Sequence, residues 1–166
     1  MPYRSLYFIC PTDCLESVIN LAFVNQNHFY TSLGNSVVFD AEMANVVKAL
    51  VLKHHIKSIY FVLALNNIIV SDVLENQAVY PITDLKNTYA IHIDKKRPTQ
   101  IPSQLRTHRS VLLSHHLNQK ISGLQQILQT LGLDHIAVSG KIYDKDRDEF
   151  DKIYSALICT AYFALN

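Results

Sequence analysis

Residues 59–65 (IYFVLAL) form the stretch that most restricts what this chain can fold into. The run contains no charged side chain and shows no alternation of apolar with polar residues. A short, uniformly apolar run is typical of a strand that is covered on both faces, as in a parallel sheet between helices. It is much shorter than the run of about 20 apolar residues that a membrane-spanning helix needs. We therefore expect an α/β protein built around this strand.

The segment before this strand has the pattern of an amphipathic helix. Its apolar residues recur at helical spacing, and they are Met43, Val47, Leu50 and Val51. Asp40 is the expected N-cap, because its carboxylate can accept hydrogen bonds from the free amides of the first turn. Lys53, His54 and His55 fall in the last turn, where positive charge complements the helix dipole. A turn at Gly34 separates this helix from the preceding strand.

Other apolar patterns predict the remaining elements. Strands are expected at residues 5–10, 28–32 and 133–142, and residues 89–93 are a further strand or an edge segment. Helices are expected at residues 15–22, 110–131 and 150–165, with Gly132 as a left-handed cap that ends the second of these.

Two polar stretches are expected to be irregular. Residues 94–109 contain two prolines and most of the local positive charge. A solvated loop is favoured over a nucleic-acid patch there, because no aromatic residues are interleaved for base stacking. Residues 143–151 (YDKDRDEFD) predict a charged turn.

Composition limits the class of protein. With 166 residues, 49% hydrophobic and 17% charged, the chain is expected to form one domain over residues 1–166 with a well-filled core. A net charge of +1 provides no strong field for nucleic acid or an anionic membrane, so neither partner is expected. Three cysteines argue against a disulfide framework, and no signal peptide is recognised, so a cytoplasmic location is expected.

Ligands of open α/β sheets bind beyond the carboxyl ends of the strands. After the central strand this place falls on residues 63–71, and no His, Cys, Asp or Glu lies between Lys57 and Ser71. A metal or acid–base site there would need ligands from elsewhere in the chain. We therefore interpret this segment as a loop that closes the core.

Cys10 is expected at the carboxyl end of the first strand, before a helix that either Thr12 or Asp13 could cap. That position can lower the pKa of a thiol and activate it as a nucleophile. A buried, inert cysteine is the favoured interpretation, because free cysteine is among the most buried residue types. Cys14 could point either way. Amides near Thr12 and Asp13 could also hold a small anion.

The order of these pieces resembles that of the β-class carbonic anhydrases. In that family a first strand ends in Cys-x-Asp-x-Arg, a second leads into Arg-Asn-Ala-Gly-Asn, a third ends in Gly-His-x-x-Cys-Gly, and a late strand carries Gly-Trp-x-Tyr-Asp. The corresponding segments here are residues 10–14 (CPTDC), 31–35 (TSLGN), 63–68 (LALNNI) and 140–144 (GKIYD). The helix that contains Asn118 and Gln119 also resembles the family's helix before its last strand. The resemblance implies a three-layer α/β domain with a mainly parallel sheet flanked by helices, and a homodimer.

The zinc ligands implied by the resemblance are missing apart from Cys10. The family's zinc is held by two cysteines and one histidine, and a catalytic zinc site needs three protein ligands. The histidine position falls on Ala64, or on Leu65 in a shifted register. The second cysteine falls on Asn67 or Ile68.

The family's Asp–Arg pair is also missing, because its positions fall on Thr12 and Cys14. A shift by one residue would use Asp13 but would place Pro11 at the cysteine and Leu15 at the arginine. No register restores the motif. Zinc is therefore expected to be absent, and without it no hydroxide forms at neutral pH to attack carbon dioxide.

The sequence thus predicts a non-catalytic protein, related in fold to β-carbonic anhydrases, that acts in protein interaction or in binding a small ligand or anion. Two enzyme alternatives stay open. One is a relocated zinc site that supports carbonate dehydratase-like chemistry, built from Cys10, Cys14 and a histidine such as His28. The adjacent pairs His54–His55 and His115–His116 are poor sources of two ligands, because neighbouring helical residues point about 100° apart. The other alternative is Cys10 as a thiolate nucleophile.

Overall fold

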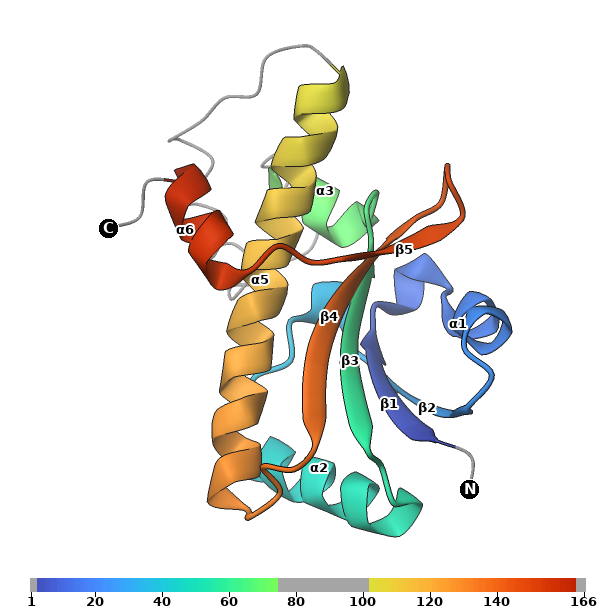
Figure 1. The fold of residues 1–166 in the computed structure, drawn as a ribbon, viewed down its shortest axis with the longest axis vertical. Coiled ribbons are helices and arrows are strands. Elements are labelled where there is room, and N and C mark those ends of the chain that lie inside the picture. Colours follow the sequence, from blue (N-terminus) through green and yellow to red (C-terminus); the bar gives the residue numbers. More distant parts are fainter. Residues whose placement is uncertain (1–2, 75–101, 164–166) are drawn as a thin grey trace.

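A five-stranded sheet runs through the computed structural model, which describes residues 3–74 and 102–163 (Figure 1). The strand order is β2-β1-β3-β4-β5, so the predicted apolar strand lies in the centre. Neighbouring strands from β2 to β4 are parallel, and β5 is antiparallel to β4. The strands are β1 Arg4–Ile9, β2 Gln26–Thr31, β3 Ser58–Ala64, β4 Ala137–Asp144 and β5 Glu149–Lys152.

Helices cover both faces of this sheet. The long helix α5 runs along one face and α2 lies across its base, while the short helix α1 lies on the other face (Figure 1). The helices are α1 Glu16–Ala22, α2 Ala41–His54, α3 Ile68–Leu74, α5 Pro102–Thr130 and α6 Ala156–Phe163. Two 3-10 turns, η1 Pro11–Asp13 and η2 Leu33–Asn35, follow β1 and β2. The predicted α/β class with a mainly parallel sheet is confirmed.

The sheet separates two cores, and this explains why the central strands β1 and β3 show no alternation of apolar with polar residues. In β1, Leu6 and Phe8 belong to the core beneath α2 and α5, and Tyr7 and Ile9 belong to the core beneath α1. Aromatic pairs cross between β1 and β3 on both faces. The ring centroids of Phe8 and Phe61 lie 4.8 Å apart on one face, and those of Tyr7 and Tyr60 lie 5.0 Å apart on the other.

Several local predictions are confirmed. The Asp40 side chain accepts a hydrogen bond from the Met43 amide at 2.9 Å and caps α2. Gly132 follows α5 with a φ of 69°, in the left-handed region that favours glycine. Strands β1, β2 and β3 lie within two residues of their predicted limits.

Thr12 and Asp13 do not cap α1, which corrects the prediction for this turn. Both residues lie in η1, and α1 is preceded by Leu15 without a side-chain cap. Cys14 separates the two elements with a φ of 53°. Cys14 thus adopts left-handed backbone angles before α1 begins. The side chains of Thr12 and Asp13 make no hydrogen bond that caps α1.

The predicted loop after β3 is only partly a loop. Residues 68–71 belong to α3, so helical structure begins four residues after the strand ends at Ala64. The predicted loop over residues 94–109 is likewise wrong from residue 102 onward, because α5 starts at Pro102. Proline is favoured in a first turn, where its missing N–H costs nothing. Residues 89–93 and 94–101 lie outside the described residues.

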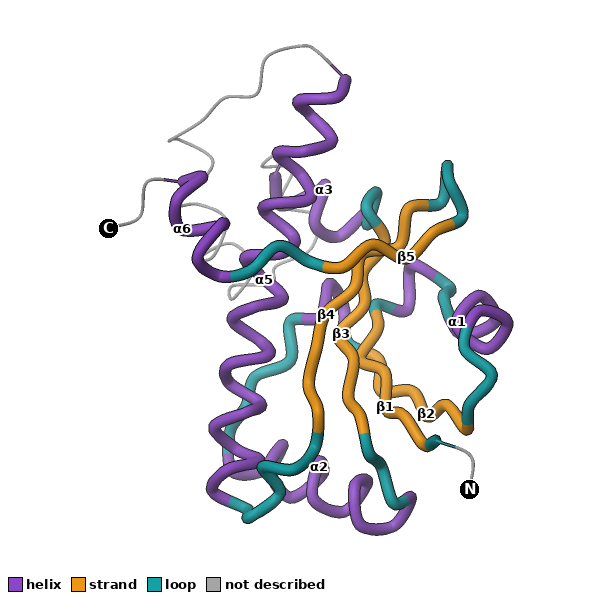
Figure 2. Tube along the Cα trace, in the orientation of Figure 1, coloured by secondary structure: helices purple, strands orange, loops and turns teal. Residues whose placement is uncertain are grey.

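The end of the chain contains a hairpin that the sequence did not predict. β4 starts at Ala137 rather than at residue 133 and extends to Asp144, and β5 follows after a four-residue turn (Figure 2). The last helix starts at Ala156, not at residue 150. Its face toward α5 buries Cys159 and Phe163, whereas Leu157 on the opposite side is 79% exposed. No helix in the described ranges is long and apolar enough to cross a membrane.

Candidate functional site

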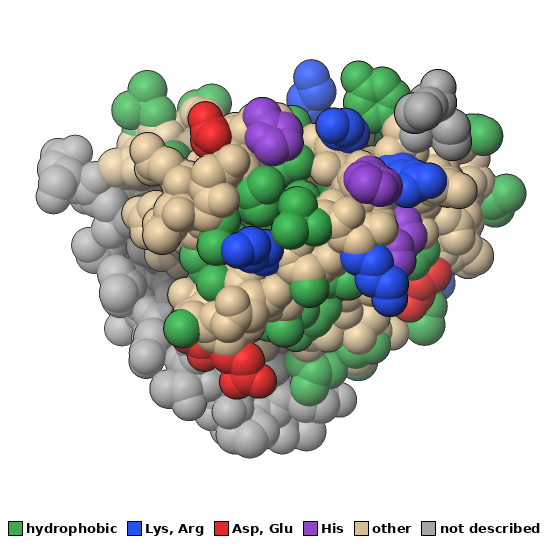
Figure 3. All heavy atoms as spheres, turned by 90° about the horizontal axis from the view of Figure 1, so that it is seen from below, with side chains coloured by type: hydrophobic (Ala, Val, Ile, Leu, Met, Phe, Trp, Pro, Cys, Tyr) green, Lys and Arg blue, Asp and Glu red, His purple; other side chains and the backbone are tan. Residues whose placement is uncertain are grey.

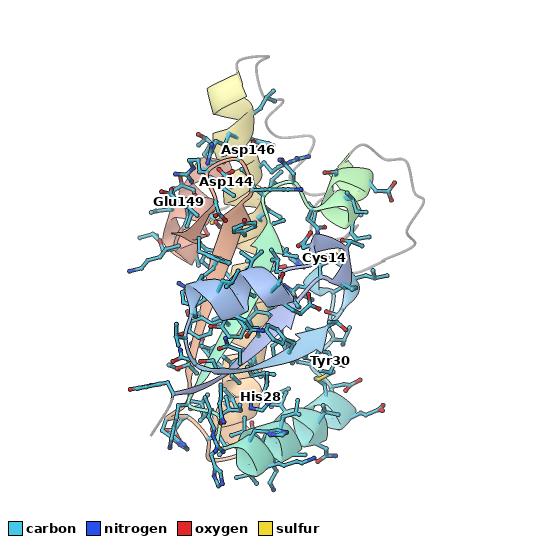
Figure 4. The ribbon with its side chains drawn as sticks, turned by 90° about the vertical axis from the view of Figure 1, so that its right-hand side faces the viewer. Cys14, His28, Tyr30, Asp144, Asp146 and Glu149 are labelled. Carbon is cyan, nitrogen blue, oxygen red and sulfur yellow. The ribbon has the colours of Figure 1, made fainter. Side chains whose placement is uncertain are left out.

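The candidate site lies where β1 and β3 end side by side. Ile9 of β1 is opposite Val62 of β3 in the sheet register, so the turns after both strands meet at the same edge. η1 follows β1 there, and the N-terminus of α3 follows β3. η2 comes from β2 on the other side of β1 and also contacts both strands. Figure 4 shows the turn that carries Cys14 at this edge of the sheet.

Asp13 connects the two strand ends through its carboxylate. Its Oδ2 accepts a hydrogen bond from the backbone N–H of Ala64 at 2.8 Å. Its Oδ1 accepts a second from Nδ2 of Asn67 at 2.7 Å. Both carboxylate oxygens therefore face N–H groups. Each N–H occupies one of the lone-pair sites of the carboxylate.

Asn67 is fixed by a second interaction at the start of α3. Its Oδ1 accepts a hydrogen bond from the Val70 amide at 2.9 Å, in the manner of a helix N-cap. Its backbone carbonyl also accepts from the Ser71 amide at 3.0 Å. Asn67 is 1% exposed. The side-chain amide is thus oriented by α3 with its NH₂ group toward Asp13.

Burial raises the pKa of the Asp13 carboxyl above its ordinary value. The hydrogen bonds from Ala64 and Asn67 favour the charged form and oppose this rise, but they do not cancel it. The carboxylate is therefore stabilised by neutral N–H donors. Among the described residues, no ion pair to Asp13 is present.

Cys10 is fully buried beside this network. Its Sγ lies 3.0 Å from Oγ1 of Thr12 and accepts a hydrogen bond from the Gly34 amide at 3.1 Å. The favoured prediction of a buried cysteine is confirmed by its exposure of 0%. The backbone of η2, and not a helix N-terminus, supplies the donor next to the sulfur. The Asp13 amide instead donates to the Cys10 carbonyl at 3.1 Å, so it is not directed at a ligand.

Asn35 joins the same strand ends from inside η2. Its Nδ2 donates to the carbonyls of Phe8 and Val62 at 3.2 and 2.9 Å. The Asn35 side chain is fully buried, and within the described ranges its Oδ1 has no hydrogen-bond partner. The Gly34 carbonyl is bonded to Nε2 of His116 on α5 at 2.9 Å. The turn is therefore held between the sheet and α5.

The six residues predicted for a vestigial site are not all brought together. Asp13, Ala64 and Asn67 form one hydrogen-bonded group, and Cys10 with Thr12 forms a neighbouring pair. Cys14 is exposed, and its Sγ donates a hydrogen bond to the Pro11 carbonyl at 3.6 Å. Ala64 takes part through its backbone alone, because its methyl group has no donor atom.

Sequence reasoning missed the roles of Gly34, Asn35 and His116 in this site. The sequence predicts a turn at Gly34, and both Gly34 and Asn35 fall in the segment 31–35 that resembles a family motif. The match of residues 31–35 to a motif of the resembled family was the signal that could have identified them. His116 carried no usable signal, because its partner is a backbone carbonyl 82 residues away.

Two arginines from the segment predicted as a solvated loop serve as structural bridges. Arg109 donates to Asn66 Oδ1 at 3.0 Å and to Ser71 Oγ at 2.9 Å, which ties α5 to the turn after β3. Arg106 forms an ion pair with Asp144, the last residue of the 140–144 motif. Asp144 is 1% exposed and also pairs with Nε of Arg147 at 3.0 Å. These contacts give both arginines a role within the fold.

The donor set at this edge does not fit zinc. Among the described residues, Cys10 is the one thiol buried there, and Cys14 is exposed to solvent. Ala64 contributes no side-chain donor, and a hydrogen bond from Asn67 to Asp13 orients those two side chains. No group of three or more His, Cys, Asp or Glu side chains in the described ranges is arranged to hold a metal ion. Two cavities, of about 380 and 310 Å³, lie elsewhere, against α5. The candidate site is thus a closed, hydrogen-bonded edge.

Comparison with known proteins identifies the fold of this chain. No family model matches the chain, and no curated protein sequence matches it. Solved structures of β-carbonic anhydrases do match. The enzyme CafD of Aspergillus fumigatus is 17% identical with a TM-score of 0.68, over 92% of this chain and 90% of that chain.

Two further structures extend this comparison. A tetrameric β-carbonic anhydrase of Sordaria macrospora is 13% identical with a TM-score of 0.73, over 93% of this chain and 81% of that chain. The Coccomyxa β-carbonic anhydrase in complex with acetazolamide is 13% identical with a TM-score of 0.62, over 99% and 84%. This chain therefore has the fold of the β-carbonic anhydrases. At this identity the similarity is one of fold.

Proposed function

We propose that this chain is a non-catalytic protein with the β-carbonic anhydrase fold, without a functional zinc site, that acts by protein interaction or by binding a small ligand or anion. One observation carries the proposal. The Asp13 carboxylate accepts hydrogen bonds from Ala64 N and Asn67 Nδ2. In one of the two registers that the resemblance allows, these residues align with the family's histidine and second cysteine; in the other, Leu65 and Ile68 do.

The requirements of a catalytic zinc site support this proposal, because the aligned residues of this chain do not meet them. Catalytic zinc needs three protein ligands and an open position for water, and it lowers the pKa of that water to about 7. Here Cys10 is the only residue of the expected ligand types at the aligned positions. A single thiolate does not hold zinc tightly, and hydration of carbon dioxide then has no nucleophile at neutral pH.

Metal analysis of the purified chain tests the proposal. We expect less than stoichiometric zinc after dialysis against a zinc-containing buffer, and no carbon dioxide hydration above the buffer rate. A matched gain-of-ligand variant, Ala64→His with Asn67→Cys, adds the two missing ligand types beside Cys10. Stoichiometric zinc in the unmodified chain, together with hydration activity, would end the proposal.

An enzyme that uses Cys10 is the second candidate. The observation that favours it is the pair of groups on the sulfur, the Gly34 amide and the Thr12 hydroxyl, because hydrogen bonds to a thiolate favour the charged form. The full burial of Cys10 opposes it, since a substrate must reach the nucleophile. A relocated zinc site is less favoured, because Cys10 is buried whereas Cys14 faces solvent.

Self-association as a homodimer is part of the proposal. The support is the exposed apolar side of α6, where Leu157 is 79% and Ile158 is 50% exposed, and the tetrameric state of the Sordaria enzyme. Sedimentation equilibrium tests it, with Leu157→Glu as the disrupting variant and Val24→Glu as a matched change at an exposed residue of another surface. A wild-type chain that sediments as a monomer at micromolar concentration contradicts it.

A cytoplasmic location is proposed on the basis of cysteine chemistry. All three cysteines of the chain are free thiols, and Cys10 and Cys159 are buried. Free thiols persist in reducing compartments. Fractionation of cells that produce the tagged protein tests this location.

A further inference from the structure

Three basic groups from three different elements meet at the opposite edge of the sheet, where the strands begin. Arg4 starts β1, His28 lies in β2, and His54 ends α2. The ring centroids of His28 and His54 are 4.2 Å apart with 37° between the planes. NH1 of Arg4 donates to the His54 carbonyl at 3.2 Å, which places the guanidinium beside both rings. Figure 4 shows His28 where β2 passes α2.

The positive charge of this cluster is not balanced by the described parts of the chain. None of the ion pairs there involves Arg4, His28 or His54. Burial lowers the pKa of His28, and the charges of His54 and Arg4 lower it further, with no acidic group among the causes. Figure 3 shows Lys, Arg and His side chains on this end of the molecule, together with Asp and Glu side chains on the same face. Lys53 and Lys57, both exposed, adjoin the cluster in sequence and through the bond from the Lys57 amide to the Arg4 carbonyl.

Mutual repulsion of this kind costs free energy unless a negative charge offsets it. The α2 carbonyls supply a partial one, because the C-terminal end of a helix carries negative partial charge. That partial charge faces the Arg4 guanidinium, which lies beside the imidazoles of His28 and His54. Arg4 uses one of its five N–H donors for the hydrogen bond to the His54 carbonyl, so other N–H groups of its guanidinium can donate to a ligand.

We infer that Arg4, His28 and His54 form a binding site for a tetrahedral oxyanion of the phosphate class. A guanidinium presents a planar fork of N–H groups that matches two oxygens of such an anion. The imidazoles add donors from a different direction, and a doubly charged anion offsets their repulsion. Binding therefore strengthens as the pH falls and His28 becomes protonated.

This inference does not rest on the proposed loss of zinc chemistry. The cluster lies at the amino-terminal edge of the sheet, and the Asp13 network lies at the carboxyl edge. Failure of the oxyanion site leaves the zinc proposal intact, and the reverse also holds.

Histidine titration by NMR tests the site in the full-length chain. Sulfate is the first probe, because it stays doubly charged over the pH range in which histidines titrate, and inorganic phosphate is the second. The pKa of His28 is measured in two buffers of equal ionic strength, one with about 20 mM sulfate and the other with sodium chloride. This sulfate concentration is high enough to occupy a weak site. We expect sulfate to raise the pKa of His28 by about half a pH unit or more, since an anion that prefers the protonated form binds it more tightly.

Two variants and one internal control complete the test. Arg4→Gln and His54→Gln are each expected to abolish most of the sulfate-induced rise, and circular dichroism confirms that each is folded. His55, which is exposed on the same end of α2 but outside the cluster, reports general screening. The inference is overturned if sulfate shifts His28 no more than His55, or if the rise persists in both folded variants.

Discussion

Nδ2 of Asn67 donates to Oδ1 of Asp13 at 2.7 Å, across 54 residues of sequence. This bond ties η1, which follows β1, to the residue that caps α3 after β3. At the carboxyl edge of the sheet, within the described residues, the Asp13 carboxylate thus accepts hydrogen bonds from two N–H groups and links the two strand ends. The first two predictions concern this relationship.

Removing either partner is expected to destabilise the fold, and the two losses are expected to be coupled. Asp13→Ala leaves the Ala64 amide and the Asn67 side chain without their acceptor, at a cost of about 1–3 kcal/mol. The double variant with Asn67→Ala is expected to show a coupling energy of about 0.5–3 kcal/mol in urea unfolding. Asp146→Ala, at an exposed residue, is the control and stays within about 0.5 kcal/mol of wild type. Strict additivity of the two losses would contradict the contact.

Stability is expected to depend on pH through Asp13. Because burial raises the pKa of this carboxyl above its ordinary 3.8, the folded state binds the proton more readily than the unfolded state does. The corresponding stability is fully present below pH 3.8 and is lost as the pH rises through the folded pKa. Urea unfolding at a series of pH values measures this, with Asp13→Asn as the variant that removes the titration. A carboxyl carbon signal of Asp13 that titrates below the ordinary range refutes the prediction.

The fold was largely predictable because its strands have a simple physical signature. A run such as residues 59–65 must be buried on both faces, and that alone places it inside a sheet covered by helices. The hairpin that ends in β5 was missed because the turn between β4 and β5 is highly charged. The end of β4 is also held by the ion pair between Arg106 of α5 and Asp144, which depends on tertiary proximity.

The candidate site was less predictable because its donors include backbone groups. The amides of Gly34 and Ala64 take part, and neither can be recognised from residue type. Asp13 was considered as a helix cap for α1. Cys14 instead adopts a left-handed turn, and the Asp13 carboxylate reaches across to β3. Nothing in residues 10–14 predicts that turn.

A methyl group at Gly140 is expected to destabilise the sheet. A Cβ at this position would lie 2.7 Å from Cδ1 of Ile153 and 3.3 Å from Cδ1 of Ile121, so side chains must shift. Gly140→Ala is expected to cost about 1–3 kcal/mol through overpacking. Ile153→Val removes the closest atom, so the double variant should recover part of the loss in urea unfolding. A Gly140→Ala chain that is as stable as wild type contradicts this packing.

Tyr7 is expected to make the fold sensitive to alkaline pH. Burial, followed by the neighbouring Tyr60, raises the pKa of Tyr7 to about 12 from its ordinary value of 10.0. Its contribution is fully present below pH 10.0 and is lost as the pH rises toward 12. Tyr7→Phe should show a smaller fall in the free energy of unfolding over that interval, measured by urea at each pH. An equal fall in both chains would mean that ionisation of Tyr7 does not change the free energy of unfolding.

Thiol labelling is expected to separate the three cysteines and to test Cys10 as a nucleophile. Cys14 is exposed, whereas Cys10 and Cys159 are fully buried, and burial raises the pKa of the Cys159 thiol. A disulfide reagent such as Ellman's reagent should therefore modify one thiol rapidly in the native chain. In Cys14→Ser no thiol should react until urea opens the fold, because buried groups become accessible only through opening. Rapid labelling of Cys10 in native Cys14→Ser, at or above the rate of free cysteine, would instead favour the thiolate enzyme, and Cys10→Ser identifies the thiol responsible.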